Sequence, residues 1–148
     1  MQLAIASDHA GYPLKAALVP WLEAEGHEVL DLGTDGTASV DYPDFGRALA
    51  EAVADGRAQR GIAICGTGIG ISIAVNRHPA LRCARVDEPV SAALARQHND
   101  ANAIALGARL IGEEMARACL TAFLSADFEG GRHQPRVDKL GARQEMPA

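Results

Sequence analysis

The sequence has few cysteines, and they form no recognisable framework. Its three cysteines, Cys65, Cys83 and Cys119, are an odd number, stand far apart and lack both a CxxC pair and the Cys/His spacing of a zinc site. This spacing argues against a disulfide scaffold and a structural zinc site, and a reducing cytoplasmic compartment fits best.

Long apolar runs and a surplus of positive charge are also absent from the sequence. No uninterrupted apolar stretch of about 18 residues occurs, and no basic segment precedes the first apolar run, so neither a membrane span nor a secretion signal is expected. The 14 Lys and Arg residues are outnumbered by 19 Asp and Glu residues, for a net charge of -5. This balance argues against nucleic acid and anionic membranes as partners, so any anion must be bound by local groups.

What the sequence does contain is sufficient for one domain over residues 1–148. Of its 148 residues 48% are hydrophobic and 22% charged, which allows a real buried core. Short apolar runs predict strands at 3–6, 29–32, 62–65, 82–86 and 103–106. Helices are expected at 13–25, with a possible kink at Pro20, from Pro43 to near Asp55, and at 69–76, 88–98 and 113–124. The tail is polar and turn-rich over 129–137, and a short terminal helix is expected at 138–144.

The alternation of strands and helices predicts the fold class. Strands that are apolar throughout and alternate with helices are typical of a parallel sheet that helices cover on both faces. We therefore expect a doubly wound α/β fold, in which the ligand crevice lies beyond the carboxyl ends of the strands. The segments expected at those ends are 8–9, 41–42, 65–70 and 87–88.

The run CGTGIGIS, from Cys65 to Ser72, follows a predicted buried strand. Its three glycines let backbone N–H groups point together at an anion, and the helix expected next adds its positive dipole end. A tight turn without a ligand needs fewer glycines, so an anion cradle is favoured. The run does not fit a dinucleotide fingerprint, because its third glycine comes one residue early, and it does not fit a P-loop, because no Lys follows Gly70.

The same field favours thiolate over thiol at Cys65, which ends a strand where substrate can reach it. A free cysteine is commonly a small buried hydrophobe, and Cys83 and Cys119 fit that description. Cys65 is a candidate nucleophile or carbon-acid base, and sequence spacing does not separate the two roles.

Two histidines have more than one interpretation. His98 lies four residues after Leu94 on the predicted apolar face of its helix, so it is either a core or C-cap histidine or a proton shuttle. Asp8 and His9 end a strand, where an Asp often caps the following helix. For His98 and for Asp8-His9, a structural role and a functional role both stay open on the sequence alone.

Arg132 and Arg136 concentrate positive charge in a glycine-rich segment of an acidic chain. They stand four residues apart, so their guanidinium groups can converge on one phosphate if the segment is helical or tightly turned. A solvated basic tail is the commoner outcome for a terminal charge cluster.

Five segments, taken together and in order, resemble the type B ribose-5-phosphate isomerase family, which also contains galactose- and allose-6-phosphate isomerases. They are SDHAG at 7–11, DYP at 41–43, CGTGIGIS at 65–72, RQHND at 96–100 and EGGRH at 129–133. The resemblance covers nearly the whole chain. It implies a Rossmann-like three-layer sandwich with a sheet of five strands, no metal or organic cofactor, and a homodimer or dimer of dimers with active sites shared between subunits.

The resemblance also implies residue roles. In the cysteine-type branch, the residue matching Cys65 moves a proton between C1 and C2 of the sugar, whereas other members use a Glu a few residues downstream, and the stretch 69–72 carries none. His98 is expected to open the furanose ring. The other expected positions are Thr67, Asp8 and Tyr42 near the sugar, Gly66, Gly68, Ile69, Gly70 and Asn99 around the enediolate oxygen, and His9, Arg132 and Arg136 on the phosphate, with Arg109 as a further contributor.

These roles make chemical sense together. Aldose–ketose isomerisation through a cis-enediolate needs a carbon base, a proton shuttle for two oxygens and donors for the developing oxyanion. We therefore expect a cytoplasmic enzyme that interconverts D-ribose 5-phosphate and D-ribulose 5-phosphate. Three alternatives stay open: an isomerase of an allose, galactose or tetrose phosphate, a non-catalytic sugar-phosphate binding module, and a hydrolase or transferase with Cys65 as covalent nucleophile, which no hydrolase motif recommends.

Overall fold

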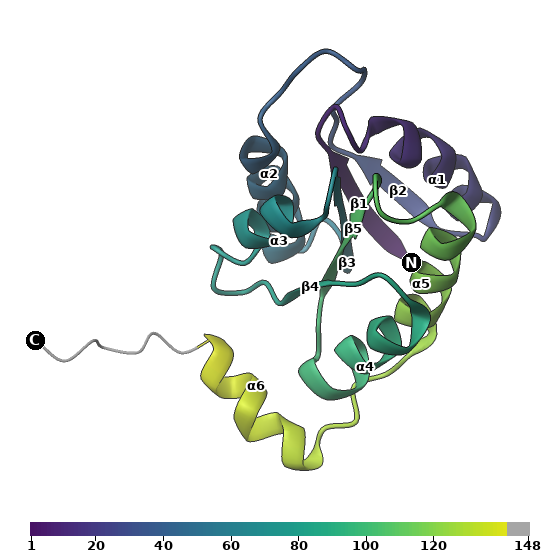
Figure 1. Cartoon of the computed structure of the whole chain (residues 1–148). Helices are drawn as coiled ribbons and strands as arrows, with labels where there is room; N and C mark the ends of the chain where they lie inside the picture. Colours follow the sequence, from purple (N-terminus) through teal and green to yellow (C-terminus); the bar gives the residue numbers. More distant parts are fainter. Residues whose placement is uncertain (142–148) are drawn as a thin grey trace, which may run out of the picture.

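The structure is a computed structural model that describes residues 1–141. Five parallel strands form one sheet in the order β2-β1-β3-β5-β4, with helices on both faces (Figure 1). The strands are β1 (Gln2–Ser7), β2 (Glu28–Asp31), β3 (Arg60–Cys65), β4 (Cys83–Arg85) and β5 (Ala103–Gly107). The helices are α1 (Tyr12–Ala24), α2 (Tyr42–Ala54), α3 (Ile69–Val75), α4 (Pro89–Asn99), α5 (Glu113–Ser125), the 3₁₀ turn η1 (Gly131–His133) and α6 (Gln134–Gly141). The predicted doubly wound α/β sandwich is confirmed.

The three inner strands are apolar on both faces, but the faces differ in side-chain size. Leu3 and Ile5 of β1 belong to one core, and Ala4 and Ala6 belong to the other. In β3 and β5 the large members are Ile62, Ile64, Ile104 and Leu106, and the small ones are Ala63, Cys65, Ala103 and Ala105. Because successive strand residues point to opposite faces, this alternation sorts large side chains to one layer and small ones to the other.

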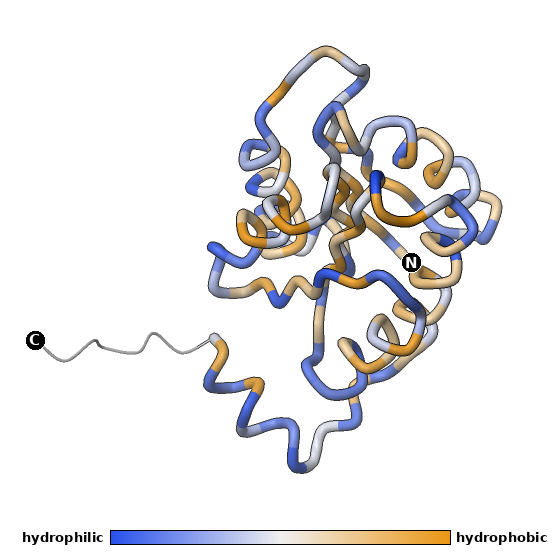
Figure 2. Tube along the Cα trace, viewed as in Figure 1, coloured by the Kyte–Doolittle hydropathy of each residue, from blue (hydrophilic) through white to orange (hydrophobic). Residues whose placement is uncertain are grey.

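The two helix layers follow this difference. Helices α1, α4 and α5 cover the face with large side chains, and α2 and α3 cover the face with small ones (Figure 1). Phe123 of α5 is fully buried, and such a side chain contributes about 1.5–3 kcal/mol relative to exposure. Hydrophobic residues of the strands and of the helices that cover them make up the two cores, and orange segments gather in the centre of the molecule in Figure 2. No helix within residues 1–141 is both long and apolar enough to cross a membrane.

The two edge strands depart from the expectation that every strand is apolar throughout. β2 is mostly exposed, with Glu28 and Asp31 in solvent, and β4 is half-buried and shorter than the predicted 82–86. An edge strand has a neighbour on one side only, so helices centred over the inner strands leave it partly uncovered. Asp31 is nevertheless anchored, because the buried Lys15 of α1 places Nζ 2.6 Å from Oδ1 and 2.7 Å from Oδ2 of that carboxylate.

Helix α6 differs from the predicted terminal helix. It begins at Gln134, inside the segment expected to be irregular, whereas a start at 138 was predicted. Val137 is the one buried residue of α6, and its neighbours in the helix are exposed. Positions 142–144 of the predicted helix lie outside the described residues. Helix α6 lies at the opposite end of the molecule from the loop between β2 and α2 (Figure 1).

The strand order positions the candidate site. The chain leaves β1 for β2 on one side and continues with β3 on the other side, so the direction of winding reverses between β1 and β3. Loops that follow two such strands diverge and leave a crevice at their carboxyl ends. Asp8 follows β1 at this point, and Cys65 is the last residue of β3.

Candidate functional site

Cys65 ends β3 in the crevice and is almost fully buried, with 4% of its surface exposed. The Gly68 N–H donates to Cys65 Sγ, with 3.2 Å between nitrogen and sulfur. The chain must turn back to make this contact, and Gly68 does so at φ +75°, a left-handed conformation that glycine adopts without steric cost. The turn between β3 and α3 therefore wraps around the sulfur atom.

Two predicted side chains lie directly against this turn. A Cβ built on Gly70 would stand 2.6 Å from the Tyr42 ring, so the ring packs on the backbone of Gly70. A Cβ built on Gly66 would stand 3.0 Å from a terminal nitrogen of Arg109, so the guanidinium lies over Gly66. Tyr42 begins α2 and Arg109 follows β5, so separate elements converge on residues 65–70.

The turn uses part of its hydrogen-bonding capacity internally. Besides the Gly68 contact to sulfur, the Ile69 N–H donates to Thr67 Oγ1 at 3.2 Å. Within residues 1–141, the N–H groups of Thr67 and Gly70 have no protein acceptor. The anion cradle expected at 66–70 therefore has donors at Thr67 and Gly70, and by the same criterion at Gly66, while Gly68 and Ile69 serve the turn itself.

Asp8 and His9 lie at the same carboxyl edge, after β1. The buried carboxylate of Asp8 accepts the Gly11 N–H at 3.0 Å, so it stabilises the turn into α1, close to the capping role considered from the sequence. Nδ1 of His9 accepts the Val40 N–H at 3.1 Å. A neutral imidazole whose Nδ1 accepts carries its proton on Nε2, so His9 offers a donor at that atom.

His98 and Asn99 lie near the amino ends of the strands, at the end of the sheet opposite to Cys65. They end α4, just before β5 begins at Ala103, whereas Cys65 is paired with Gly107 at the far end of β5. Five strand residues span about 15 Å, so one copy of the chain does not bring His98 to Cys65.

The exposure of His98 corrects its expected placement on a buried apolar face. Its side chain is 36% exposed, and Leu94 on the same side of the helix is 38% exposed. The face of α4 turned to the core carries Ala92, Ala95 and Arg96 instead. Two alanines and an arginine face the core here, so the hydrophobicity of Leu94 was a misleading guide.

The two tail arginines, Arg132 and Arg136, lie in the same part of the molecule as His98. The Glu129 N–H donates to the Gln97 carbonyl at 3.0 Å, and the His133 ring stacks on His98 with 4.4 Å between centroids. Arg132 precedes His133 in the chain, and Arg136 follows in α6. The predicted site residues therefore form two groups, one around Cys65 and one around His98.

The His98 group holds a cluster that the sequence did not single out. Burial lowers the pKa of His133, and the nearby His98 and Arg132 lower it further. Ligand atoms of His98, Glu129 and His133 all lie within 4.8 Å of one another. The two rings are parallel to within 13°, so their nitrogen lone pairs run side by side instead of meeting at one point, as a tetrahedral metal ion requires.

Arg85 is a further polar residue at the crevice that sequence reasoning missed. It ends β4, and its Nε donates to the Thr67 carbonyl oxygen at 2.8 Å, while Nη1 lies 2.8 Å from Asp87. A signal was present in the sequence, because Arg85 is a cation inside a predicted strand whose carboxyl end faces the crevice.

Of the other two cysteines, Cys119 is buried as the sequence predicted, whereas Cys83 is only partly buried. Cys119 is fully buried in the core beneath α5, and Cys83 packs against the opposite core. Burial raises the pKa of Cys83 to about 12 and that of Cys119 to about 11. Neither thiol is suited to proton transfer near neutral pH.

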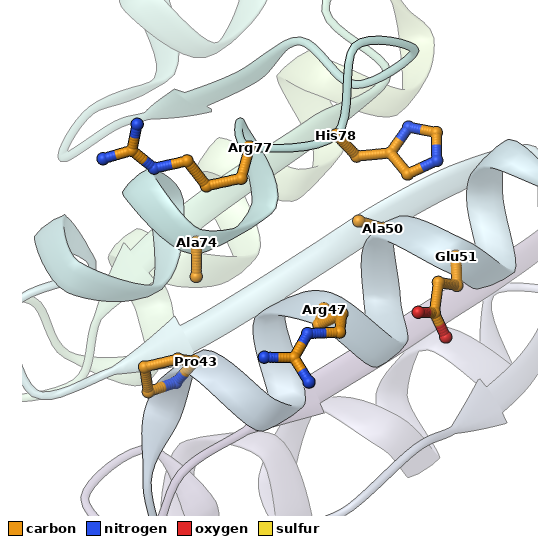
Figure 3. A pocket seen from close by; sticks show the side chains of 7 residues that line it. All are labelled: Pro43, Arg47, Ala50, Glu51, Ala74, Arg77 and His78. Atoms are coloured by element: carbon orange, nitrogen blue, oxygen red, sulfur yellow. The ribbon is translucent and has the colours of Figure 1, made fainter.

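A shallow pocket between α2 and α3 has no part in this constellation (Figure 3). It is lined by Pro43, Arg47, Ala50, Glu51, Ala74, Arg77 and His78. In Figure 3 Arg77 points away from Arg47 and Glu51, so the charged groups do not converge on one ligand. None of the predicted site residues lines it.

Comparison with known proteins gives a consistent picture. Residues 3–140 match the model of a family described as Ribose/Galactose Isomerase. Ribose-5-phosphate isomerase B of Escherichia coli (strain K12) is 46% identical over 141 residues, which cover 95% of both proteins. D-erythrulose-4-phosphate isomerase of Pectobacterium atrosepticum is 43% identical over 142 residues, covering 95% of this chain and 93% of that protein.

The fold agrees with the sequence match. The solved structure of ribose-5-phosphate isomerase B from Clostridium thermocellum has a TM-score of 0.94 and 50% identity, over 95% of each chain. The chain therefore belongs to the ribose/galactose isomerase family of aldose–ketose isomerases, as its five motifs predicted.

Proposed function

We propose that this protein interconverts D-ribose 5-phosphate and D-ribulose 5-phosphate, with Cys65 as the base that carries the proton between C1 and C2. The observation that carries the proposal is the hydrogen bond from the Gly68 N–H to Cys65 Sγ at the carboxyl end of β3. A donor on sulfur favours the charged form, which is the form able to take a proton from carbon. The names of the E. coli and C. thermocellum relatives support the choice of substrate.

The step proceeds through a cis-enediolate. The Cys65 thiolate takes the proton from C2 of the open-chain aldose, and the C–H electrons form a C1–C2 double bond as negative charge moves to O1. The thiol then returns the proton to C1, and His98 moves the hydroxyl proton from O2 to O1, which gives the ketose. Donors at Thr67, Gly70 and Asn99 stabilise the oxyanion, and His98 opens the furanose ring beforehand.

Phosphate is held at the other end of the extended sugar. His9 donates from Nε2, and Arg132, Arg136 and Arg109 supply guanidinium groups that can each form paired hydrogen bonds to phosphate oxygens. Binding energy from this remote group positions C1 and C2 over the sulfur.

A complete site needs a second copy of the chain. In one copy Cys65 lies at the carboxyl ends of the strands and His98 lies near their amino ends, so the group around His98 must come from a partner. Ile69 and Ile73 stand one turn apart on α3, beside the turn that holds Cys65, and are 50% and 51% exposed. This apolar stripe is the surface we assign to the second copy, in a homodimer or a dimer of dimers.

The proposed base is tested by isotope exchange. Ribose 5-phosphate incubated with the enzyme in deuterated water should gain deuterium at C2 of the recovered aldose. Cys65→Ala should lose exchange by roughly 10²–10⁴-fold and still bind the sugar phosphate, because only the proton acceptor is removed. Cys83→Ala, which removes a thiol outside the site, should exchange at the wild-type rate. Normal exchange in Cys65→Ala would show that another group is the base.

A second substrate class has a specific observation in its favour. The relative named D-erythrulose-4-phosphate isomerase is nearly as similar to this chain as the E. coli enzyme. A panel of tetrose, pentose and hexose phosphates, with allose and galactose 6-phosphates included, would rank the substrates by kcat/KM. A clear preference for a tetrose or hexose phosphate would replace ribose 5-phosphate and leave the proposed base intact.

The proposed reaction uses no hydride carrier and no metal ion. Prolonged dialysis against EDTA should therefore leave kcat unchanged, and a loss that Zn²⁺ or Mg²⁺ restores would contradict this part of the proposal.

A cytoplasmic location stays a prediction from the three widely spaced cysteines, and cell fractionation would test it.

A further inference from the structure

We propose that Arg85 is a positioning residue for Cys65, because it holds the Thr67–Gly68 peptide so that the Gly68 N–H stays on the sulfur atom. This inference rests on the proposed role of Cys65 as base, and Arg85 itself acts without touching the sugar.

The geometry of one peptide unit links the two side chains. The Thr67 carbonyl oxygen accepts from Arg85 Nε at 2.8 Å, and the N–H of the same peptide unit donates to Cys65 Sγ at 3.2 Å. In a trans peptide the C=O and N–H bonds point in opposite directions. A donor that fixes the carbonyl on one side therefore fixes the direction of the N–H on the other.

The neighbouring strand completes the support. A Cβ on Gly107 would stand 2.6 Å from the Thr67 carbonyl oxygen, so this oxygen packs against the bare α-carbon at the end of β5. A Cβ on Gly68 would stand 2.9 Å from the Leu106 carbonyl carbon. The peptide is thus enclosed by β5, Arg85 and the sulfur, and Arg85 is the part of this support that carries a charge.

Arg85 is itself held in place. It is paired in register with Ala105 of β5, and Asp87 accepts from its Nη1 at 2.8 Å. Its side chain is 27% exposed, so the bond to Thr67 is shielded on most sides. A cation hydrogen-bonded to a carbonyl polarises the peptide and makes its N–H a stronger donor, which strengthens the contact to sulfur.

The experiment measures thiolate formation without turnover. Ultraviolet absorbance near 240 nm follows thiolate during a pH titration, and subtraction of the Cys65→Ala titration isolates the Cys65 signal. In Arg85→Met the midpoint pH of this signal should rise by roughly 0.5–1 unit, a three- to tenfold loss of thiolate at a given pH. Arg57→Met removes an exposed cation just before the amino end of β3, far from Cys65, and should keep the wild-type midpoint.

Kinetics with ribose 5-phosphate give an independent readout. Arg85→Met should lower kcat roughly three- to tenfold and leave KM within about twofold, because the change affects the base and not the bound sugar. A loss confined to KM would assign Arg85 to substrate binding and overturn the proposal. A midpoint equal to that of Arg57→Met would also overturn it.

Two further provisions keep the test decisive. Arg85→Lys keeps the charge but lacks a donor at the Nε position, so it serves if the methionine variant does not fold, and its midpoint should rise by a smaller amount. An unshifted midpoint in the lysine variant would then overturn the proposal. Should wild-type enzyme fail to turn over any sugar phosphate, the proposed function would be wrong, while the titration would still report on the link between Arg85 and Cys65.

Discussion

At the scale of single residues, the histidine pair beside α6 gives the protein a pH-sensitive element. His133 is buried and stacked on His98, and burial together with the nearby positive groups lowers its pKa. Glu129 acts in the opposite direction, and Arg136 adds to the lowering. The folded state therefore favours the neutral form of His133 more strongly than the unfolded chain does.

Stability should consequently fall as the medium becomes acidic. The unfolded chain takes up a proton on His133 near pH 6.5, before the folded protein does, so the free energy of unfolding should decrease as pH falls below that value. Urea unfolding at pH 7.5 and 5.5 measures the loss. His133→Asn should lose less stability over this interval than wild type, whereas His27→Asn, at a half-buried position outside this pair, should lose as much as wild type. Equal losses in His133→Asn and wild type would mean that folding does not lower the pKa of His133.

A second residue-scale prediction concerns the Tyr42 ring. Gly70→Ala places a methyl group 2.6 Å from that ring, which is 41% exposed and can turn toward solvent. Stability should stay within about 1 kcal/mol of wild type, because a flexible side chain absorbs the clash. Activity with ribose 5-phosphate should fall roughly tenfold, mainly through KM, since the ring no longer faces the sugar. Gly36→Ala, where nothing lies within 4 Å of the new Cβ, is the matched control.

At the scale of elements, the end of β5 fixes the turn that follows β3. Gly107 faces the Thr67 carbonyl, and the Ala108 and Arg109 N–H groups donate to the carbonyls of Cys65 and Gly66 at 2.9 Å each. The turn around sulfur is therefore shaped by a strand that is distant in the sequence, as well as by its own glycines.

Gly107→Ala should disturb this support far more than Gly70→Ala. The new Cβ would stand 2.6 Å from a backbone carbonyl, which cannot swing aside, so the turn must move and the Gly68 N–H leaves the sulfur. We expect a loss of about 1–3 kcal/mol in the free energy of unfolding and roughly a hundredfold loss in kcat. Gly112→Ala, with open space around the new Cβ, should match wild type in both measurements. A wild-type kcat in Gly107→Ala would mean that the position of the turn does not matter.

At the scale of the whole molecule, two copies are needed to complete the proposed site. Each site is expected to take Cys65 from one copy and His98 from the other. Cys65→Ala and His98→Ala proteins should each be inactive alone, since every site then lacks one group.

Mixing the two inactive variants tests this sharing directly. In a mixed dimer one site carries both substitutions and the other carries neither, so an equal mixture after subunit exchange should regain about a quarter of wild-type activity. A mixture of Cys65→Ala with Cys65→Ser is the control and should stay inactive. No recovery, under conditions where mass spectrometry detects mixed dimers, would place both groups in one copy and contradict the topology.

Much of the fold was predictable because the signals are local. The apolar runs predicted five strands, and all five exist within a residue or two of their expected bounds. The three inner strands are buried and need continuous hydrophobicity, and the exposed edge strand β2 still carries the apolar Val29 and Leu30. The start of α6 was missed because Val137 is its one buried residue, so the segment lacks the repeated buried apolar positions by which a helix is predicted. The exposure of β2 was missed because edge position depends on strand order, which hydrophobicity does not encode.

For the site, the sequence alone determined the chemical inventory: a thiol at the end of a strand, a glycine turn, and imidazole and guanidinium groups in motifs of the family. Tertiary structure decided how these groups are divided. The tertiary structure gathered one group at the carboxyl ends of the strands: Asp8, Tyr42, the turn at 65–70 and Arg109. It placed His98 and Arg132 near the amino ends. The physical reason is that a residue's neighbours along the chain fix its local conformation, whereas its distance from other groups depends on strand order and helix direction. The contact from Arg85 to the Thr67 carbonyl, formed across elements 18 residues apart, belongs to that second kind of information.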